Sequence, residues 1–279
     1  MNQIGVVHLA RAQNGLKPFE DFLRSYRQHP AGIAHDLVVV FKGFGSKEAA
    51  APWEKAASDI PHKTIFISDW GFDLRAYRLA AEQMETPFGY FLNSFSEILS
   101  DGWLEKTFAL MQRGRTGIVG ATGSWESMYS NAIRDFGRIA PTALGRRLSG
   151  FARVKACQFC FNPFPNYHLR TNAFMMSHDV MLNLWPRCIL TKRGAYLFEN
   201  GKNGLTHRIL SLGLNALVVG KNGVGYDKED WVGSNTFRKS DQQNLLVADN
   251  QTRLYQSADE RTKSLLSAFA WGDRAAVLP

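Results

Sequence analysis

The apolar residues of this chain fall into short runs that alternate with segments of helical periodicity. Five runs read as buried strands, at residues 4–9, 36–41, 64–68, 88–92 and 116–121. Helices are predicted between them, at residues 15–28, 49–57 and 74–84 and again from residue 101. In the first helix, Leu16, Phe19, Leu23 and Tyr26 recur at the spacing of one helix face. This alternation predicts an α/β fold with a mostly parallel central sheet, right-handed crossovers and flanking helices, in a single domain.

Polar residues gather directly after the strand at residues 88–92. Asn93 and Ser94 open a loop that also contains Glu97, and a helix begins near Trp103. In open α/β sheets the ligand lies in the crevice beyond the carboxyl ends of the strands. We therefore expect the chemistry of the protein at this loop.

Two common nucleotide-binding loops are missing from the first half of the chain. A dinucleotide fold requires Gly-any-Gly-any-any-Gly directly after the first strand, but Leu9 is followed by Ala-Arg-Ala-Gln-Asn-Gly. A phosphate loop ending in Gly-Lys-Ser or Gly-Lys-Thr is also absent from the sequence. The sequence thus argues against both of these nucleotide sites.

The polar loop, with its acidic residue and its Gly-Trp-Leu helix start, resembles the nucleotide-sugar loop of GT-A glycosyltransferases of the family-2 type. In that family an Asp-any-Asp pair in this loop holds a divalent metal, Mn or Mg, on the diphosphate of the donor. Asn93 and Phe95 stand at those two positions here. The resemblance implies a nucleoside-diphosphate sugar as donor, without the usual metal ligands. Asp227 is the one candidate ligand if a metal does bind, although a single carboxylate makes a poor site for either ion.

The segment after the third strand contains further donor candidates. Asp69 and Asp73 flank a Trp-Gly-Phe sequence that resembles the family segment opening the helix of the nucleotide pocket. The Gly-Phe-Asp triplet and the Ala-Tyr pair of this segment resemble the same segment of bacterial polysaccharide enzymes related to rhamnan synthesis. Either carboxylate could accept a hydrogen bond from the base or the ribose, and for Asp73 a simple helix cap is an equally open interpretation. Three more donor contacts are expected at the ends of the first two strands, from His8, Arg11 and Lys42.

Residues 166–175 resemble the family strand that lies under the donor sugar. Within them, Arg170 and Asn172 are candidates for contacts with the acceptor or the diphosphate. A guanidinium can bind two phosphate oxygens at once, which a site poor in metal ligands would require. The alternative for Arg170 is an ion pair with a surface acid, and His168 in the same segment is expected to be structural.

Glu199 is the predicted general base. In the family, an acidic pair before a helix provides the carboxylate that takes the proton from the acceptor hydroxyl. Glu199 is the only acid between Asp179 and Asp227, although it stands slightly out of register with the family spacing. One base near the acceptor is sufficient for a single inverting displacement, and a retaining reaction is left open. The alternative interpretation is a glutamate at a helix amino terminus.

The positive charge of the chain is concentrated in one segment. Of the net charge of +8, residues 131–170 contribute seven Lys or Arg against one acid, and they also hold six aromatic side chains. Basic charge mixed with aromatics suits a membrane surface or an anionic lipid-linked acceptor. The same charge would attract nucleic acid, which we do not expect as a partner of this family. An ordinary solvated helix and loop is the alternative.

The remaining composition suggests a cytoplasmic protein, peripheral on the inner face of a membrane. No apolar run approaches the roughly 20 residues needed to span a bilayer. The amino terminus does not read as a signal peptide, because residues 4–9 form a strand without a basic lead-in. The three cysteines cannot all pair, and Cys157 and Cys160 are interpreted as thiols of the core.

Together these features predict a glycosyltransferase of bacterial surface polysaccharide synthesis, acting on a saccharide or a lipid-linked acceptor. Residues 1–123 would form the donor half of a single domain, and residues 124–279 the acceptor half, with residues 131–170 inserted in it. The alternative is a catalytically degenerate GT-A protein that binds nucleotide sugar or glycan as a scaffold, which the missing Asp pair favours.

Overall fold

The computed structural model describes residues 2–272 and has one large β-sheet at its centre. Eight strands form the sheet in the order β11-β10-β6-β9-β4-β1-β2-β3. Their bounds are β1 (Ile4–Arg11), β2 (Asp36–Lys42), β3 (Lys63–Ile67), β4 (Phe88–Leu92), β6 (Thr116–Gly120), β9 (Ala173–Ser177), β10 (Asn215–Val219) and β11 (Gly225–Tyr226). The predicted strand at residues 88–92 is confirmed at both ends. Those predicted from residues 4, 36 and 116 begin as predicted and end one or two residues away, and the one predicted at residues 64–68 is shifted at both ends.

The sheet is mostly parallel, as predicted. β1 pairs in parallel with β2 and β4, β2 with β3, and β10 with β6. β9 is antiparallel to both of its neighbours, β4 and β6, and β11 is antiparallel to β10. Because β9 comes from the second half of the chain and lies between two strands of the first half, the two halves share one sheet.

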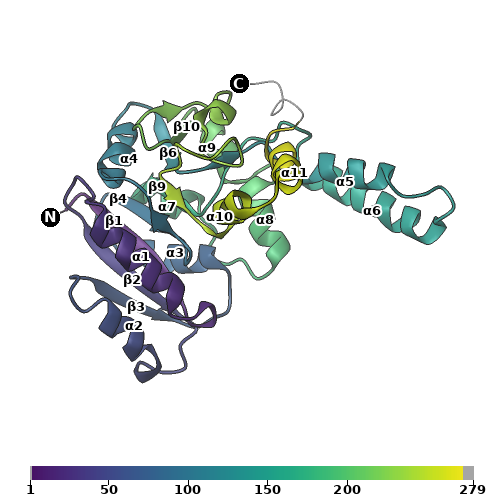
Figure 1. Ribbon diagram of the computed structural model, residues 1–279. Helices are drawn as coiled ribbons and strands as arrows, with labels where there is room; N and C mark the ends of the chain where they lie inside the picture. The colour runs from purple at the N-terminus through teal and green to yellow at the C-terminus, as the bar shows by residue number, and fades with distance from the viewer. Residues whose placement is uncertain (1, 273–279) are drawn as a thin grey trace.

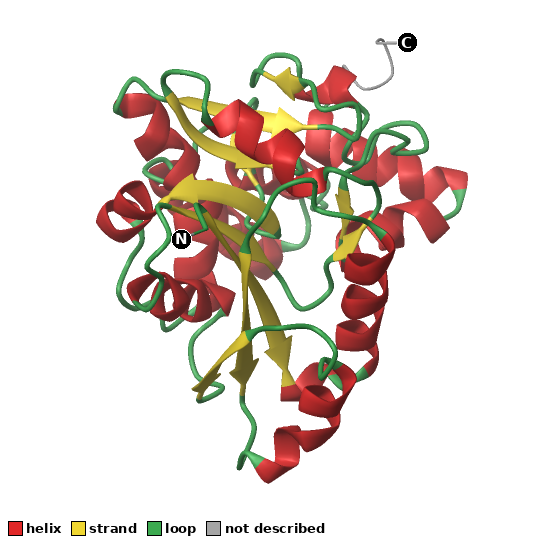
Figure 2. Ribbon diagram, turned by 90° about the vertical axis from the view of Figure 1, so that its left-hand side faces the viewer, coloured by secondary structure: helices red, strands yellow, loops and turns green. Residues whose placement is uncertain are grey.

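Helices cover both faces of this sheet (Figures 1 and 2). On one face, α1 (Lys17–Gln28) and α4 (Trp103–Met111) bury Phe22 and Trp103 against Val6 and Val39. The opposite face packs on α3 (Asp73–Glu82), α7 (His178–Leu184), α8 (Lys192–Asn200) and α9 (Leu205–Ser211). Successive residues of a strand point to opposite faces, so Val7 belongs to the second core and its neighbour Val6 to the first.

Shorter elements build up the edge of the sheet where the strands end. β5 (Glu97–Ile98) pairs with β12 (Val247–Ala248), and β7 (Gly123–Ser124) pairs with β8 (His168–Leu169). The remaining elements of the body are α2 (Ala51–Ala56), α10 (Asn250–Ser257), α11 (Glu260–Trp271), η1 (Ala12–Asn14), η2 (Glu48–Ala50) and η3 (Trp231–Ser234). The two small pairs hold the loops after β4 and β6 at the same edge.

Two helices, α5 (Met128–Gly137) and α6 (Leu144–Cys160), form a hairpin that projects from the body (Figure 1). α6 has no buried residue along its length. The interpretation of Cys157 and Cys160 as core thiols is therefore wrong, since both lie half-buried on this projecting helix. None of the helices within residues 2–272 is long and apolar enough to cross a bilayer.

Candidate active site

Three charged residues meet where β1, β2 and β3 end. The strand register pairs Arg11 with Lys42, and Lys42 with Ile67, which places Asp69 just beyond the same edge. Arg11 donates from Nε to Oδ1 of Asp69 at 2.7 Å and from Nη2 to Oδ2 at 2.8 Å. The hydrogen bond from Arg11 holds the pKa of Asp69 below its usual value, although partial burial opposes it. Arg11 and Asp69 thus orient one another at the mouth of the sheet edge.

Lys42 lies behind this pair and is almost fully buried, at 1% exposure. Its Nζ donates to the backbone oxygen of Gly71. Burial lowers the pKa of Lys42, while the negative charge of Asp73 acts in the opposite direction. Gly43 permits the close approach of these segments, because it has a φ of +79° and an added Cβ would lie 2.9 Å from the Asp69 Cβ.

Asp73 begins α3 and faces inward. The N-cap of the helix is Phe72, and no side chain caps it, so the structure does not give Asp73 the capping role that was left open. Burial raises the pKa of Asp73, the charges of Lys42 and Arg11 lower it, and the charges of Asp69 and Glu199 raise it. Because the charges of these four residues all act on its pKa, Asp73 lies among them in the charged cluster.

Asp73 and Glu199 line the same cavity, which has a volume of about 220 Å³. Its lining consists of Phe72, Asp73, Leu74, Thr171, Lys192, Ala195, Tyr196 and Glu199. The start of α3 forms one wall, and α8 with the loop before β9 forms the other. The structure therefore brings the predicted base and one predicted donor ligand into a shared site, although they are far apart in the sequence.

Glu199 lies in the last turn of α8, so it is not at a helix amino terminus as the alternative interpretation required. Its Oε1 accepts a hydrogen bond from the backbone N of Thr171 at 2.7 Å and another from the Thr171 hydroxyl at 3.1 Å. Within residues 2–272, Oε2 has no hydrogen-bond partner. One carboxylate oxygen is thus fixed, and the other is available to a ligand.

His168 lies close to Glu199, inside the protein. It is 4% exposed, and its Nδ1 is 2.9 Å from the backbone oxygen of Asn166. Burial lowers the pKa of His168, while the charge of Glu199 opposes the shift. The ring is thus enclosed by the protein and oriented by the backbone of Asn166.

Arg170 forms an ion pair, but with a buried acid rather than a surface one. Its Nη2 donates to Oδ2 of Asp249 at 2.7 Å, and the Asp249 side chain is 1% exposed. Burial alone would raise the pKa of Asp249, but the charge and hydrogen bond of Arg170, together with the hydrogen bonds of Thr252, outweigh it and keep that pKa low. The guanidinium also donates to the hydroxyl of Thr122 at 3.3 Å and stacks on Phe237 at 4.4 Å. Arg170 is therefore held firmly beside the ends of β6 and β9.

Asn172 and Asn93 connect the two halves of this edge. The backbone N of Asn93 donates to the backbone oxygen of Asn172 at 2.9 Å. Asn172 Oδ1 accepts from the Thr122 hydroxyl at 2.8 Å, while its Nδ2 is buried without a partner among the described residues. Because Thr171 contacts Glu199, the loop after β4 and the predicted base lie on the same side of the molecule.

The loop after β4 does not provide metal ligands. Asn93 Oδ1 accepts hydrogen bonds from the backbone N of Phe95 at 3.0 Å and from the Ser96 hydroxyl at 3.1 Å, which shapes the turn. Ser94 is buried, and Asp227 is exposed beyond β11 at the far edge of the sheet. In the part of the chain that the structure describes, no three His, Cys, Asp or Glu side chains lie together as a metal site. The residues present therefore do not fit the metal of the resembled family.

The position of His8 argues against a donor contact. It is fully buried under α1, with its ring stacked on Phe22 at a centroid distance of 3.7 Å. Burial lowers the pKa of His8 to about 3. Its side chain points to the α1 face because Leu9 and Val7, its neighbours along the strand, point to the other face.

Sequence reasoning missed two charged residues near this site. Glu126 follows β7 and accepts a hydrogen bond from Asn131 Nδ2 at 2.9 Å. Arg238 is 8% exposed and stacks on Phe237 at 4.8 Å, on the ring that also contacts Arg170. Burial lowers the pKa of Arg238, and the charge of Arg170 acts in the same direction. Neither residue lies in a periodic segment or a recognisable motif, so the sequence held no signal for them.

No protein-family model matches this chain, and no curated protein matches it in sequence. Solved structures do match. A mannosyltransferase from Pyrobaculum calidifontis, in complex with GDP-Man and Mn2+, is 10% identical at a TM-score of 0.49, over 85% of this chain and 60% of its own. S. aureus TarS in complex with UDP-GlcNAc is 19% identical at a TM-score of 0.35, over 42% of this chain and 33% of its own. The 4-diphosphocytidyl-2C-methyl-D-erythritol synthase of Anaerococcus prevotii is 10% identical at a TM-score of 0.42, over 71% of this chain and 83% of its own. The chain thus spans less than two thirds of the length of the mannosyltransferase and of TarS, and glycosyltransferases are among the structures that it is similar to.

Proposed function

We propose that this protein is a GT-A type glycosyltransferase that moves a sugar from a nucleoside-diphosphate sugar to a saccharide or a lipid-linked saccharide. The observation that carries the proposal is the cavity shared by Asp73 and Glu199 at the carboxyl edge of the sheet. Ligands of open α/β sheets bind at this edge. The proposed pathway is bacterial surface polysaccharide synthesis, on the cytoplasmic side of a membrane.

The donor half comprises residues 1–123 in this proposal. Asp69 and Asp73 accept hydrogen bonds from the nucleoside, and the loop at Asn93 and Ser94 borders the diphosphate. Positive charge is available from Arg11, which is held in place by Asp69, and from Lys42 behind it. His8 is left out, because it is buried on the other face of the sheet.

The acceptor half comprises residues 124–279, and Glu199 is its base. Thr171 fixes Oε1, so Oε2 is free to accept the acceptor hydroxyl. The acceptor oxygen transfers its proton to Glu199 and bonds to the anomeric carbon. The bond from that carbon to the diphosphate oxygen breaks at the same time, and the nucleoside diphosphate leaves with the electron pair. A single displacement of this kind inverts the anomeric carbon, and product anomer analysis tests it.

No step of the proposed reaction uses a metal, because the donor set does not fit one. Charge on the leaving diphosphate is instead offset by the cations at the sheet edge, with Arg170 and Asn172 at its acceptor side. Arginine binds phosphate oxygens in pairs, which suits this role. We therefore expect UDP, GDP or dTDP to bind with an affinity that EDTA does not change.

The decisive experiment compares Glu199→Gln with Glu85→Gln. Glu85 is exposed beside Asp36 and Thr86, at the opposite end of the strands. Calorimetry with UDP, GDP and dTDP first identifies the nucleotide, and transfer is then measured with the matching sugar nucleotide and cell-surface glycan extracts. General bases contribute about 10²–10⁴-fold, so Glu199→Gln should lose that much transfer and retain nucleotide affinity, while Glu85→Gln keeps both. Undiminished transfer by Glu199→Gln would refute the assignment.

The scaffold alternative is also supported by one observation. The Asn93 side chain has its oxygen engaged in the turn, at the position where the resembled family has a metal-binding aspartate. A scaffold would bind the same nucleotide sugar but would show neither transfer nor hydrolysis under any metal condition. Turnover of the donor by the wild type, lost in Glu199→Gln, excludes it.

A further inference from the structure

One face of α6 exposes a row of large apolar side chains. Leu144 and Leu148 are each 73% exposed, Phe151 is 53% exposed and Phe159 is 81% exposed. Their spacing of four, three and eight residues places them along one face of the helix. We call these four residues the α6 stripe. α6 runs from the tip of the projecting hairpin to its root (Figure 1), and the stripe extends from its first residue, Leu144, to Phe159 near its end.

Most of the contacts that hold the hairpin together lie outside the stripe. A different face of α6 packs on α5, where half-buried Gly150 lies so close that an added Cβ would be 2.8 Å from Ile139 and 3.0 Å from Phe136. Arg153 pairs with Asp135 at 3.2 Å, and Arg147 stacks on Phe136 at 4.9 Å. Of the stripe, Phe151 takes part in the hairpin contacts, with its ring centroid 6.4 Å from that of Phe136. Leu144, Leu148 and Phe159 are 73% to 81% exposed.

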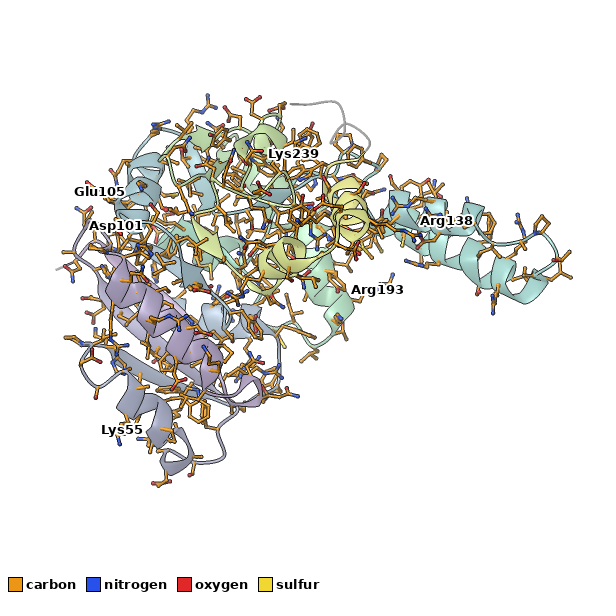
Figure 3. The ribbon with its side chains drawn as sticks, viewed as in Figure 1. Lys55, Asp101, Glu105, Arg138, Arg193 and Lys239 are labelled. Carbon is orange, nitrogen blue, oxygen red and sulfur yellow. The ribbon has the colours of Figure 1, made fainter. Side chains whose placement is uncertain are left out.

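The hairpin that carries the stripe is strongly basic. Six Lys or Arg between residues 128 and 160 face a single acid, Asp135, so the hairpin carries a net charge of +5. Arg138, Arg146, Arg153 and Lys155 are exposed, and Arg138 stands on the hairpin well away from the body (Figure 3). Lys155 lies within the stripe and approaches the Phe151 ring at 5.6 Å. Lys155 is thus the cation on the face of the stripe, and the helical spacing places Arg146 and Arg153 on the other side of α6.

The root of the stripe opens into a second cavity. Phe159 lines it, with Ile189 and Leu197 as other apolar walls and with Lys202 and Arg208 as cations. The cavity has a volume of about 370 Å³ and lies on the opposite side of α8 from Asp73. The combination of apolar surface and cations therefore continues from the tip of α6 to the body.

We propose that the α5–α6 hairpin docks on the surface of an anionic lipid bilayer through the α6 stripe. The apolar side chains of the stripe are more than half exposed, and they would enter the boundary between headgroups and acyl chains. Cations on the hairpin would bind the anionic headgroups. Nucleic acid would use the cations but would leave Leu144 and Leu148 exposed. This surface lies outside the cleft, and its docking does not depend on the proposed transferase reaction.

Vesicle flotation of the full chain tests this proposal. Vesicles of phosphatidylcholine with one quarter phosphatidylglycerol should float the wild type, and pure phosphatidylcholine should float at least tenfold less. The double variant Leu148→Glu/Phe151→Glu should reduce binding to the anionic vesicles at least tenfold. Its matched control is Leu212→Glu/Leu254→Glu, because these leucines are 59% and 51% exposed on the body. The control should float like the wild type.

Charge is tested separately with Arg138→Glu/Arg146→Glu. Flotation of the wild type should fall steeply as salt is added, and this variant should lose flotation at all salt concentrations. The control Lys55→Glu/Lys63→Glu should behave like the wild type, since both lysines are exposed and Lys55 lies at the other end of the molecule in Figure 3. Circular dichroism melts should coincide for all variants, since none of the altered residues is buried.

Three results would overturn the proposal. The first is no flotation on anionic vesicles, and the second is equal flotation on the neutral ones. In the third, light scattering shows that the wild type is a dimer and that Leu148→Glu/Phe151→Glu is a monomer, while both bind vesicles equally. The stripe would then be an interface between two copies of the chain.

Discussion

Thr171 donates two hydrogen bonds to a single oxygen of Glu199, one from its backbone N and one from its hydroxyl. This contact joins the end of α8 to the loop that precedes β9. On either side of Thr171, Arg170 is paired with Asp249, and Asn172 is hydrogen-bonded to Thr122 and Asn93. The orientation of Glu199 therefore depends on a loop that is itself fixed to both halves of the sheet.

We expect Thr171→Val to reduce turnover without weakening nucleotide binding. Valine keeps the shape and the backbone N–H but removes the 3.1 Å hydroxyl bond. A hydrogen bond to a charged group contributes about 1.5–3 kcal/mol, so kcat should fall about tenfold or more if the bond orients the base. Steady-state kinetics separates kcat from KM. Thr64→Val, an exposed position on β3, is the control, and an unchanged kcat in Thr171→Val would show that the hydroxyl is dispensable.

The Arg11–Asp69 pair should matter for binding and not for stability. Its side chains are 32% and 45% exposed, and exposed ion pairs contribute about 0–1 kcal/mol to folding. Arg11→Ala should therefore leave the urea midpoint nearly unchanged but weaken nucleotide binding at least tenfold in calorimetry. Arg27 forms a comparable exposed pair with Asp59, at 2.8 Å from its Nε, and is a matched control. Equal effects of Arg11→Ala and Arg27→Ala on nucleotide affinity would show that Arg11 does not contribute to nucleotide binding.

Loss of the buried pair between Arg170 and Asp249 should destabilise the fold strongly. Arg170→Met leaves the Asp249 carboxylate without its cation at 1% exposure, and breaking a buried ion pair in this way typically costs about 3–5 kcal/mol. Asp249→Asn should cost a similar amount, and the double variant should be less destabilised than the sum of the two. Urea unfolding measures all three variants. Arg153→Met, which breaks an exposed pair, should change stability by less than about 1 kcal/mol.

The order of strands and helices was predictable because apolar periodicity is a local property of the sequence. Phe88 to Leu92 is a short run without polar side chains, a polar residue follows it directly, and the structure confirms both of its ends. The antiparallel insertion of β9 between β4 and β6 was not predictable from such patterns, since nothing local to Ala173–Ser177 specifies its neighbours in the sheet. Pairing of distant strands depends on the packing of the whole chain.

Individual side chains were harder to place than elements. His8 was expected at the donor site because β1 ends there, but strand alternation turns it under α1, and β1 continues to Arg11. Cys157 and Cys160 were expected in the core because cysteine is among the most buried residue types. Both lie on α6, which projects from the body. In both cases the residue type alone did not indicate the surroundings of the side chain, because these are set by tertiary structure.

Burial of His8 should make the protein less stable in mild acid. Its pKa is about 3 in the folded chain and about 6.5 when unfolded, so the unfolded chain binds more protons between those values and stability falls as the pH falls through that range. From pH 7 to pH 5 this one group should lower the free energy of unfolding by about 2 kcal/mol.

His8→Leu should remove that share of the pH dependence and should not lower stability at pH 7, because both ring nitrogens of His8 are buried without partners among the described residues. His168 and His207 also have pKa values lowered by burial, so the variant should keep part of the acid sensitivity. Urea midpoints of wild type and His8→Leu at pH 5, 6 and 7 measure the difference, and parallel pH profiles for the two proteins would show that His8 is not buried as a neutral ring.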